Sequence, residues 1–139
     1  MFCPFCNILE KDQEKILSER KYCFVVFSNP RLMPGHLLII PKRHIEKPSI
    51  LSKREREEIF DTVVEFQEKI LAKVSSGCDI RQHCRPFQKQ DDLKIDHLHF
   101  HLQPRELFDE LYQKCQVFER GIFRQVKEME QGIIDRLNL

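Results

Sequence analysis

The sequence lacks any run of about twenty consecutive apolar residues, the length that a transmembrane helix needs. It also lacks an excess of charge of either sign, because 23 Lys and Arg stand against 22 Asp and Glu, for a formal net charge of +1. A balanced composition does not indicate a strongly anionic partner. We therefore expect no transmembrane helix and neither a membrane nor a nucleic acid as partner.

Signals for secretion and for a disulfide framework are missing as well. The segment Met1–Cys6 has no basic stretch, and its apolar run is too short for a secretory signal peptide. The six cysteines, at positions 3, 6, 23, 78, 84 and 115, do not follow the spacing of a disulfide-stapled domain. We expect a cytoplasmic protein whose cysteines are thiols or metal ligands. Its 139 residues suffice for one domain with a real core.

Half of the six histidines fall within the stretch 97–101, where His97, His99 and His101 alternate with apolar residues. On a β-strand, alternate side chains project to opposite faces, so the three imidazoles would share one side. Leu98, Phe100 and Leu102 would then pack into the core. A helix would scatter the imidazoles around its axis. Since imidazole can act as nucleophile, proton carrier or metal ligand, the pattern predicts a functional site on a strand.

The remaining elements are predicted from apolar periodicity and turn residues. Four further strands are predicted at 14–19, 22–27, 36–40 and 79–87. A capping box, Ser52-Lys-Arg-Glu55, predicts a helix whose apolar stripe continues to Val74. A second stripe of apolar residues, from Leu107 to Leu137, predicts a long C-terminal helix that could kink or divide at Gly121.

The motif Cys3-Pro4-Phe5-Cys6 predicts a metal site or a redox site. Two thiolates at this spacing can bind one tetrahedral zinc ion, but a structural zinc site needs four ligands. No second Cys-x-x-Cys exists, so either histidines supply the missing pair or zinc is absent. A thioredoxin-type redox motif needs a strand before it, and two preceding residues cannot form one.

Two motifs together resemble the histidine triad (HIT) superfamily of nucleotide hydrolases and transferases. They are Pro-Gly-His-Leu-Leu-Ile-Ile-Pro-Lys at 34–42 and His-Leu-His-Phe-His-Leu-Gln-Pro-Arg at 97–105. The family motif is His-φ-His-φ-His-φ-φ, with φ apolar, and its last position here is the polar Gln103. The resemblance, which covers 3–105, implies an α+β fold in which an antiparallel sheet of about five strands carries the long helices on one face. We expect a single domain over 1–139, with a core at 1–105 and a C-terminal helical extension at 106–139.

The resemblance also implies an activity. His99 would attack the α-phosphorus of a nucleotide conjugate, and water would release the nucleoside monophosphate from the nucleotidyl-imidazole. The residues themselves nominate the same nucleophile, because His99 is flanked by the other two histidines. His101 and His36 would donate hydrogen bonds to phosphate oxygens. The implied partners are a purine nucleotide conjugate (a phosphoramidate, an adenylate or a dinucleoside polyphosphate) and a second copy of the chain. No catalytic metal would be required.

The implied contacts to substrate come from two segments. Ser28 or Asn29 lies where the family places a polar contact to ribose, and Phe27 belongs to the expected wall for the base. The best-known branches carry Gly-Gln-Ser/Thr before the triad, which donates hydrogen bonds to phosphate. Residues 91–96, Asp-Asp-Leu-Lys-Ile-Asp, have no hydroxyl, so Lys94 is the candidate donor here.

The resemblance completes the metal site too. In family members with an N-terminal Cys-x-x-Cys, zinc is held by the His after Pro-Lys-x and by the first His of the triad. Those positions here are His44 and His97. We therefore expect a structural zinc ion on Cys3, Cys6, His44 and His97, which would fasten the N-terminal segment to the sheet.

Two other interpretations remain open. A nucleotide-binding or scaffold protein with negligible turnover would keep the pocket, and the missing Gly-Gln-Ser/Thr segment favours it. In a third interpretation the triad is itself a metal centre. Within the predicted strand 79–87, His83 and Cys84 are interpreted as incidental, whereas Arg85 could reach an anion.

Overall fold

The computed structural model describes residues 2–116 and 127–138. The chain divides into two compact units, Met1–Glu106 and Leu107–Leu139, and each is described here by itself. All of the strands described lie in the first unit.

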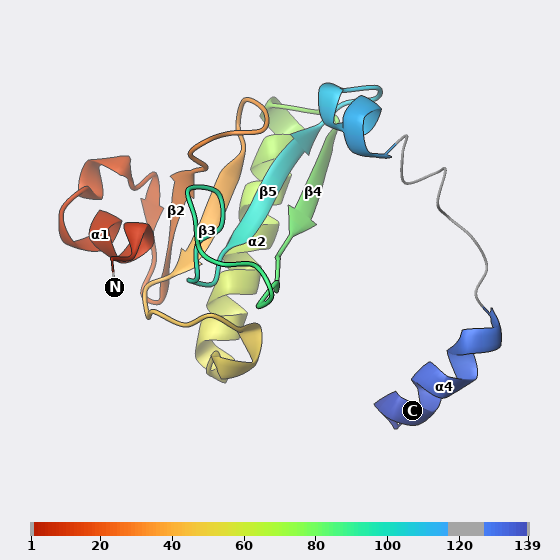
Figure 1. Ribbon diagram of the computed structural model, residues 1–139. Coiled ribbons are helices and arrows are strands. Elements are labelled where there is room, and N and C mark those ends of the chain that lie inside the picture. The colour runs from red at the N-terminus through yellow and green to blue at the C-terminus, as the bar shows by residue number, and fades with distance from the viewer. Residues whose placement is uncertain (1, 117–126, 139) are drawn as a thin grey trace. The chain divides into compact units, whose positions relative to one another are not determined.

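The first unit is built on one antiparallel sheet (Figure 1). Its strands are β1 (Ser18–Glu19), β2 (Cys23–Phe27), β3 (Leu37–Pro41), β4 (Gly77–Arg81) and β5 (Phe100–Arg105). They are ordered β1-β2-β3-β5-β4, and every neighbouring pair is antiparallel. The predicted α+β class with a five-stranded antiparallel sheet is confirmed.

The mid-chain helix, α2 (Lys53–Lys73), begins where the capping box predicts. The Ser52 hydroxyl accepts a hydrogen bond from the Glu55 amide at 3.2 Å, and the Glu55 carboxylate accepts one from the Ser52 amide at 3.1 Å. These reciprocal bonds satisfy two amides that the first helical turn leaves free. A shorter helix, α1 (Pro4–Glu10), begins inside the Cys-x-x-Cys motif.

The two faces of the sheet are covered by different parts of the chain. Figure 1 shows α2 against one face of the sheet, and the buried residues of this layer include Val25, Ile39, Ile59, Val63, Leu98 and Leu102. On the other face, Phe5 of α1 is buried with Phe24, Val26, Leu38 and Ile40. Alternation along β2 and β3 sends successive side chains to the two layers, so both strands are apolar throughout.

Two predicted strands are shorter than the sequence pattern suggests. Over 14–19, only Ser18–Glu19 is a strand, because Gln13–Lys15 forms a 3₁₀ turn whose Gln13 side chain donates to the Leu9 carbonyl at 2.8 Å. The predicted strand 79–87 is wrong in its second half, since β4 spans Gly77–Arg81. β4 pairs with β5 only up to Arg81, which lies opposite His101, so residues beyond Arg81 have no strand partner.

The histidine stretch keeps its alternation although only its last histidine lies in a strand. β5 begins at Phe100, so His97 and His99 precede it in irregular chain. The Leu98 amide donates to the Ile45 carbonyl at 2.6 Å, which ties this segment to the loop after β3. Leu98 and Phe100 still face the α2 layer, as predicted.

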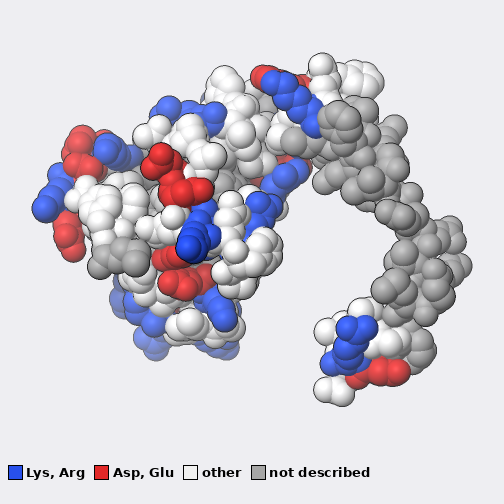
Figure 2. All heavy atoms as spheres, viewed as in Figure 1, with Lys and Arg blue, Asp and Glu red and all other residues white. Residues whose placement is uncertain are grey.

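The second unit contains helical segments at Tyr112–Gln116 and at α4 (Lys127–Leu137). The predicted helix from Leu107 to Leu137 falls partly outside the described residues, as does Gly121. No helix among the described residues is long and apolar enough to span a membrane. Figure 2 shows acidic and basic side chains mixed on the face of the first unit that is in view, in keeping with the balanced composition.

Candidate active site

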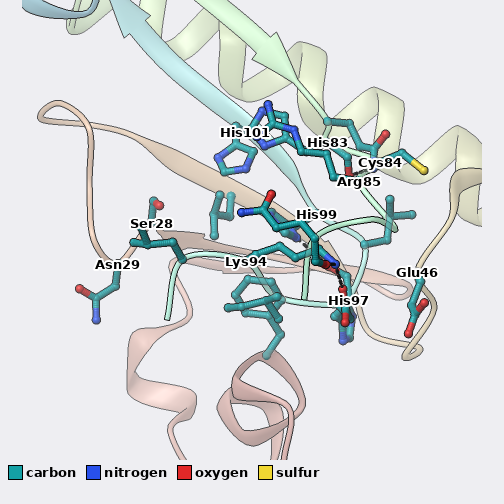
Figure 3. A pocket seen from close by; sticks show the side chains of 18 of the residues that line it. Ser28, Asn29, Glu46, His83, Cys84, Arg85, Lys94, His97, His99 and His101 are labelled. Carbon is teal, nitrogen blue, oxygen red and sulfur yellow. Dashed lines mark hydrogen bonds and ion pairs between the residues drawn. The ribbon is translucent and has the colours of Figure 1, made fainter. Parts of the chain in front are cut away.

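A cavity of about 470 Å³ lies on the face of the sheet opposite α2. Its wall includes Phe5, the turn that follows β2 (28–30), the start of β5 and parts of the segment 82–99 between β4 and β5. The residues that line it include His36, His83, His99, His101, Ser28 and Lys94. Figure 3 shows His99 near its centre, with His101 and His83 together at one end.

His36 and His101 form a hydrogen-bonded pair whose proton positions follow from a backbone contact. The Leu32 amide, which can only donate, lies 3.2 Å from His36 Nδ1. In neutral His36 the proton is therefore on Nε2, which donates to His101 Nδ1 at 2.9 Å. Neutral His101 then carries its own proton on Nε2. Burial is the largest cause that lowers the pKa of His36 to about 4 and of His101 to about 3, so both are neutral at pH 7.

His99 is oriented by a carbonyl of its own segment. Its Nδ1 lies 2.7 Å from the His97 carbonyl oxygen, which can only accept, so Nδ1 carries the proton. The lone pair of neutral His99 is therefore on Nε2. Burial lowers the pKa of His99, which keeps the imidazole unprotonated and nucleophilic near neutral pH. The ring also meets Phe5 edge-on, with centroids 5.1 Å apart.

His97 has the opposite arrangement. Its Nε2 donates to the Pro41 carbonyl at 2.8 Å, so the lone pair of the neutral ring is on Nδ1. That nitrogen points at three other potential ligands: it lies 3.1 Å from His44 Nδ1, 3.4 Å from Cys3 Sγ and 3.7 Å from Cys6 Sγ. The four predicted ligand atoms all lie within 4.8 Å of one another. These four residues could hold a metal ion.

The donor set fits tetrahedral zinc. With zinc–nitrogen bonds of about 2.0 Å and zinc–sulfur bonds of about 2.3 Å, the ligand atoms should be roughly 3.3–3.8 Å apart. The Cys6 Sγ to His44 Nδ1 distance is 3.4 Å, and the three distances to His97 Nδ1 run from 3.1 to 3.7 Å. Burial, followed by the neighbouring Cys3, raises the pKa of the Cys6 thiol to about 11, so binding a cation here would release a proton.

The third interpretation, a metal centre made by the triad, is not favoured by this geometry. His97 Nδ1 lies within 3.7 Å of both cysteine sulfurs, whereas His99 and His101 do not belong to that cluster. Within the described part of the chain, no second group of three or more His, Cys, Asp or Glu side chains gathers its ligand atoms in the same way.

Of the residues predicted to contact substrate, some line the pocket and one does not. Ser28 and Asn29 line the pocket, at some distance from His83 in Figure 3. Lys94 lines it too, but its ammonium group donates to the Asp96 carboxylate and to the Gln88 carbonyl. Phe27, expected in the wall for the base, lies outside the lining: its side chain is 42% exposed and the Arg31 guanidinium lies over its ring. Phe27 follows the alternation of β2, which points it away from the pocket.

Two lining residues were missed by the sequence analysis. Phe5 is buried against both His97 and His99, at centroid distances of 5.7 and 5.1 Å, and so joins the metal cluster to the pocket. His83, interpreted as incidental, lies 5.1 Å from His101 between ring centroids. The fact that every other histidine already had a role could have drawn attention to it.

Comparisons with known proteins agree with this arrangement. The HIT domain family model matches residues 9–107 of the chain. A nitrilase and fragile histidine triad fusion protein, NitFhit, from Drosophila melanogaster is 32% identical over 111 residues. The match covers 76% of this chain but 22% of that protein, so the chain spans about a fifth of the length of this relative.

Solved structures share the fold. A HIT family protein from Bacillus anthracis superposes with a TM-score of 0.70 at 22% identity, covering 98% of this chain and 94% of its own. A HIT family hydrolase from Legionella pneumophila superposes with a TM-score of 0.59 at 22% identity, covering 78% and 97%. At these identities the likeness concerns the fold.

Proposed function

The chain belongs to the HIT domain family, and on that premise we propose that it is a nucleotide phosphohydrolase or nucleotidyl transferase. It acts at the α-phosphate of a purine nucleotide conjugate and releases the nucleoside monophosphate. The conjugate is a phosphoramidate, an adenylate or a dinucleoside polyphosphate.

The observation that carries the proposal is the orientation of His99. Its Nδ1–H is held by the His97 carbonyl at 2.7 Å, which leaves the Nε2 lone pair in the pocket. Nε2 attacks the α-phosphorus, a phosphorus–nitrogen bond forms, and the bond to the leaving group breaks. A held Nδ1–H also stabilises the imidazolium that this bond creates. Water then cleaves the phosphorus–nitrogen bond.

His36 and His101 support the transfer. Because His36 donates to His101 Nδ1 at 2.9 Å, the Nε2–H of His101 is free to donate to a phosphate oxygen. Ser28 and Asn29, which also line the pocket, contact the ribose in this proposal. Lys94 contributes little to phosphate binding while Asp96 neutralises it.

The metal in this proposal is structural zinc on Cys3, Cys6, His44 and His97. It would fasten α1 to the sheet, and thereby hold Phe5 of α1 against His99. The chemistry at phosphorus uses no metal. Elemental analysis of the purified protein tests the assignment: about one zinc per chain supports it, and a metal content that Cys6→Ser leaves unchanged contradicts it.

The proposed assembly is a homodimer. β4 lies at the edge of the sheet with Ile80 43% exposed, and α2 exposes Phe60, Val64 and Leu71. Exposed apolar side chains and a strand at the edge of the sheet favour pairing with another copy. Light scattering on a size-exclusion column gives the mass; a monomer at micromolar concentration would contradict this assembly.

The experiment that tests the function measures monophosphate release from adenosine phosphoramidate and from a diadenosine polyphosphate. Wild type should release adenosine monophosphate, His99→Ala should not, and Phe87→Ala should match wild type because Phe87 is exposed and lies outside the pocket lining. A chelator added during the assay should leave the initial rate unchanged. Turnover by His99→Ala at the wild-type rate would overturn the covalent mechanism.

A second candidate function is nucleotide binding without turnover. It is favoured by the loop before the triad, where Lys94 is paired with Asp96 and no hydroxyl is available for phosphate. This candidate predicts that adenosine monophosphate raises the melting temperature while neither conjugate is cleaved.

A further inference from the structure

His83 lies in the pocket without a role in the steps described so far. It follows β4 in the segment 82–87, and its ring lies beside that of His101, with centroids 5.1 Å apart and planes inclined by 33°. His101 in turn lies 4.9 Å from His99. Figure 3 shows His83 and His101 at the same end of the pocket, above His99.

The second half of the proposed reaction needs a proton acceptor. Water that attacks phosphorus must lose a proton, and a positioned base accelerates such a step. His99 cannot serve, because its Nε2 is bonded to phosphorus at that stage. In the neutral pair, His36 uses both nitrogens and His101 Nδ1 accepts from His36, so neither ring has a free lone pair.

The ring of His83 does have a free lone pair. Among the described residues, neither ring nitrogen of His83 has a hydrogen-bond partner, so one lone pair of the neutral ring is free. Partial burial, together with the charges of Arg85, His99 and Arg81, lowers its pKa and keeps it neutral at pH 7. The three carboxylates that line the pocket are placed less well: Asp96 is paired with Lys94, Asp92 is exposed to solvent, and Glu46 lies away from His83 in Figure 3.

We propose that His83 is the general base that activates water for hydrolysis of the nucleotidyl-His99 intermediate. The inference rests on the proposed function and extends it. The water oxygen forms a bond to phosphorus as the phosphorus–Nε2 bond breaks, and the water proton moves to His83. His99 returns to its neutral form, and the nucleoside monophosphate leaves. His83 is exposed at the mouth of the pocket, so its imidazolium returns the proton to solvent.

A single-turnover experiment separates the two halves of the reaction. Labelled conjugate is mixed with excess enzyme, the reaction is quenched with alkali, and nucleotidyl-protein and free monophosphate are followed over time. In His83→Gln, formation of nucleotidyl-His99 should change less than threefold, whereas its hydrolysis should slow by about 100-fold or more, because general base catalysis contributes at least that much. Phe87→Ala, in the same exposed segment, serves as the control.

A nucleophile with no proton to lose distinguishes a base from a residue that shapes the site. Azide should discharge the intermediate of wild type and of His83→Gln at rates within threefold of each other, giving the nucleoside phosphorazidate. If azide discharge falls as far as hydrolysis does, His83 positions the intermediate and the inference is wrong.

The remaining outcomes are equally decisive. Hydrolysis by His83→Gln within threefold of wild type overturns the inference while the proposed function stands. A selective loss of the first step also overturns it. If wild type forms no nucleotidyl-protein, the proposed function itself fails.

Discussion

All six histidines of the chain gather at two neighbouring places, and the two places use imidazole differently. His44 and His97 gather with Cys3 and Cys6, whereas the other four histidines line the pocket, whose wall His97 also joins. The two groups meet at the triad, because His97 and His99 are separated by a single residue. Phe5 contacts both rings.

The difference between His97 and His99 lies in which ring nitrogen donates to a carbonyl. His97 donates from Nε2 to Pro41, which leaves Nδ1 for the metal cluster. His99 donates from Nδ1 to the His97 carbonyl, which leaves Nε2 for phosphorus. The carbonyl oxygen that each ring contacts thus decides which ring nitrogen keeps its lone pair, and the two histidines of one motif differ in chemistry for that reason.

The largest effect is expected from His99→Ala. Removing the nucleophile should lower the rate of monophosphate release by roughly 10⁴-fold or more, since loss of a covalent catalyst has effects of that size. Zinc content should stay at the wild-type value, because His99 is not among the four ligands. Steady-state kinetics and elemental analysis of the same preparation check both expectations. A variant that loses zinc together with activity would contradict the division.

The converse change is His97→Ala. It removes the ligand whose Nδ1 lies within 3.7 Å of both cysteine sulfurs, so bound zinc should fall to background. The melting temperature should fall by about 10 °C, because a structural metal adds its binding free energy to folding. Differential scanning calorimetry with and without chelator is the measurement. Wild type treated with chelator should resemble the variant; a chelator-insensitive wild type would contradict a structural metal.

A smaller effect on activity is expected from replacing Phe5, which lies between the metal cluster and the pocket. Phe5→Leu keeps an apolar side chain in the buried site but loses the edge-on contacts with both histidines. Activity should fall about tenfold while zinc content stays constant, because a loosened wall lets His99 leave its productive geometry. Ile8→Val, a similar truncation on the same helix, should leave activity within twofold of wild type. Equal losses in the two variants would mean that the contact with His99 has no special role.

The fold could be predicted because alternation and capping are local signals. The apolar runs of β2 and β3 and the Ser52 capping box sufficed for those elements. The ends of β1 and β4 could not be predicted, since β1 is cut short by the 3₁₀ turn at Gln13–Lys15 and β4 ends where its partner strand stops. Arg81 is the last residue of β4 because it lies opposite His101, near the start of β5.

The site was predictable only in part, because its geometry also depends on contacts between segments that are distant in the sequence. His97, His99 and His101 stand out by their spacing, and the four metal-cluster residues came from resemblance. His83 gave no local signal, because its neighbours in sequence are polar and its relation to His101 arises from the sheet register. The tautomers depend on carbonyls of Pro41 and His97, which no sequence pattern reveals.

The smallest effect concerns stability against pH. The pKa of His36 is about 4 in the folded chain and about 6.5 when unfolded, so between these values the unfolded chain binds more protons. Folding stability should therefore fall as pH decreases from 6.5 towards 4. In His36→Asn this loss should be smaller by about 1–2 kcal/mol between pH 7.5 and 5.0. Urea titrations of both proteins at the two pH values give the difference; equal losses would contradict a buried neutral His36.

The division between His97 and His99 is tested most directly by long-range ¹H–¹⁵N correlation spectra of the ¹⁵N-histidine protein. The account predicts that His97 carries its proton on Nε2 and has Nδ1 bound to metal. It predicts that His99 carries its proton on Nδ1 and has an unprotonated Nε2. A proton on Nε2 of His99 at neutral pH would contradict it, because the nitrogen proposed to attack phosphorus would then have no lone pair to offer.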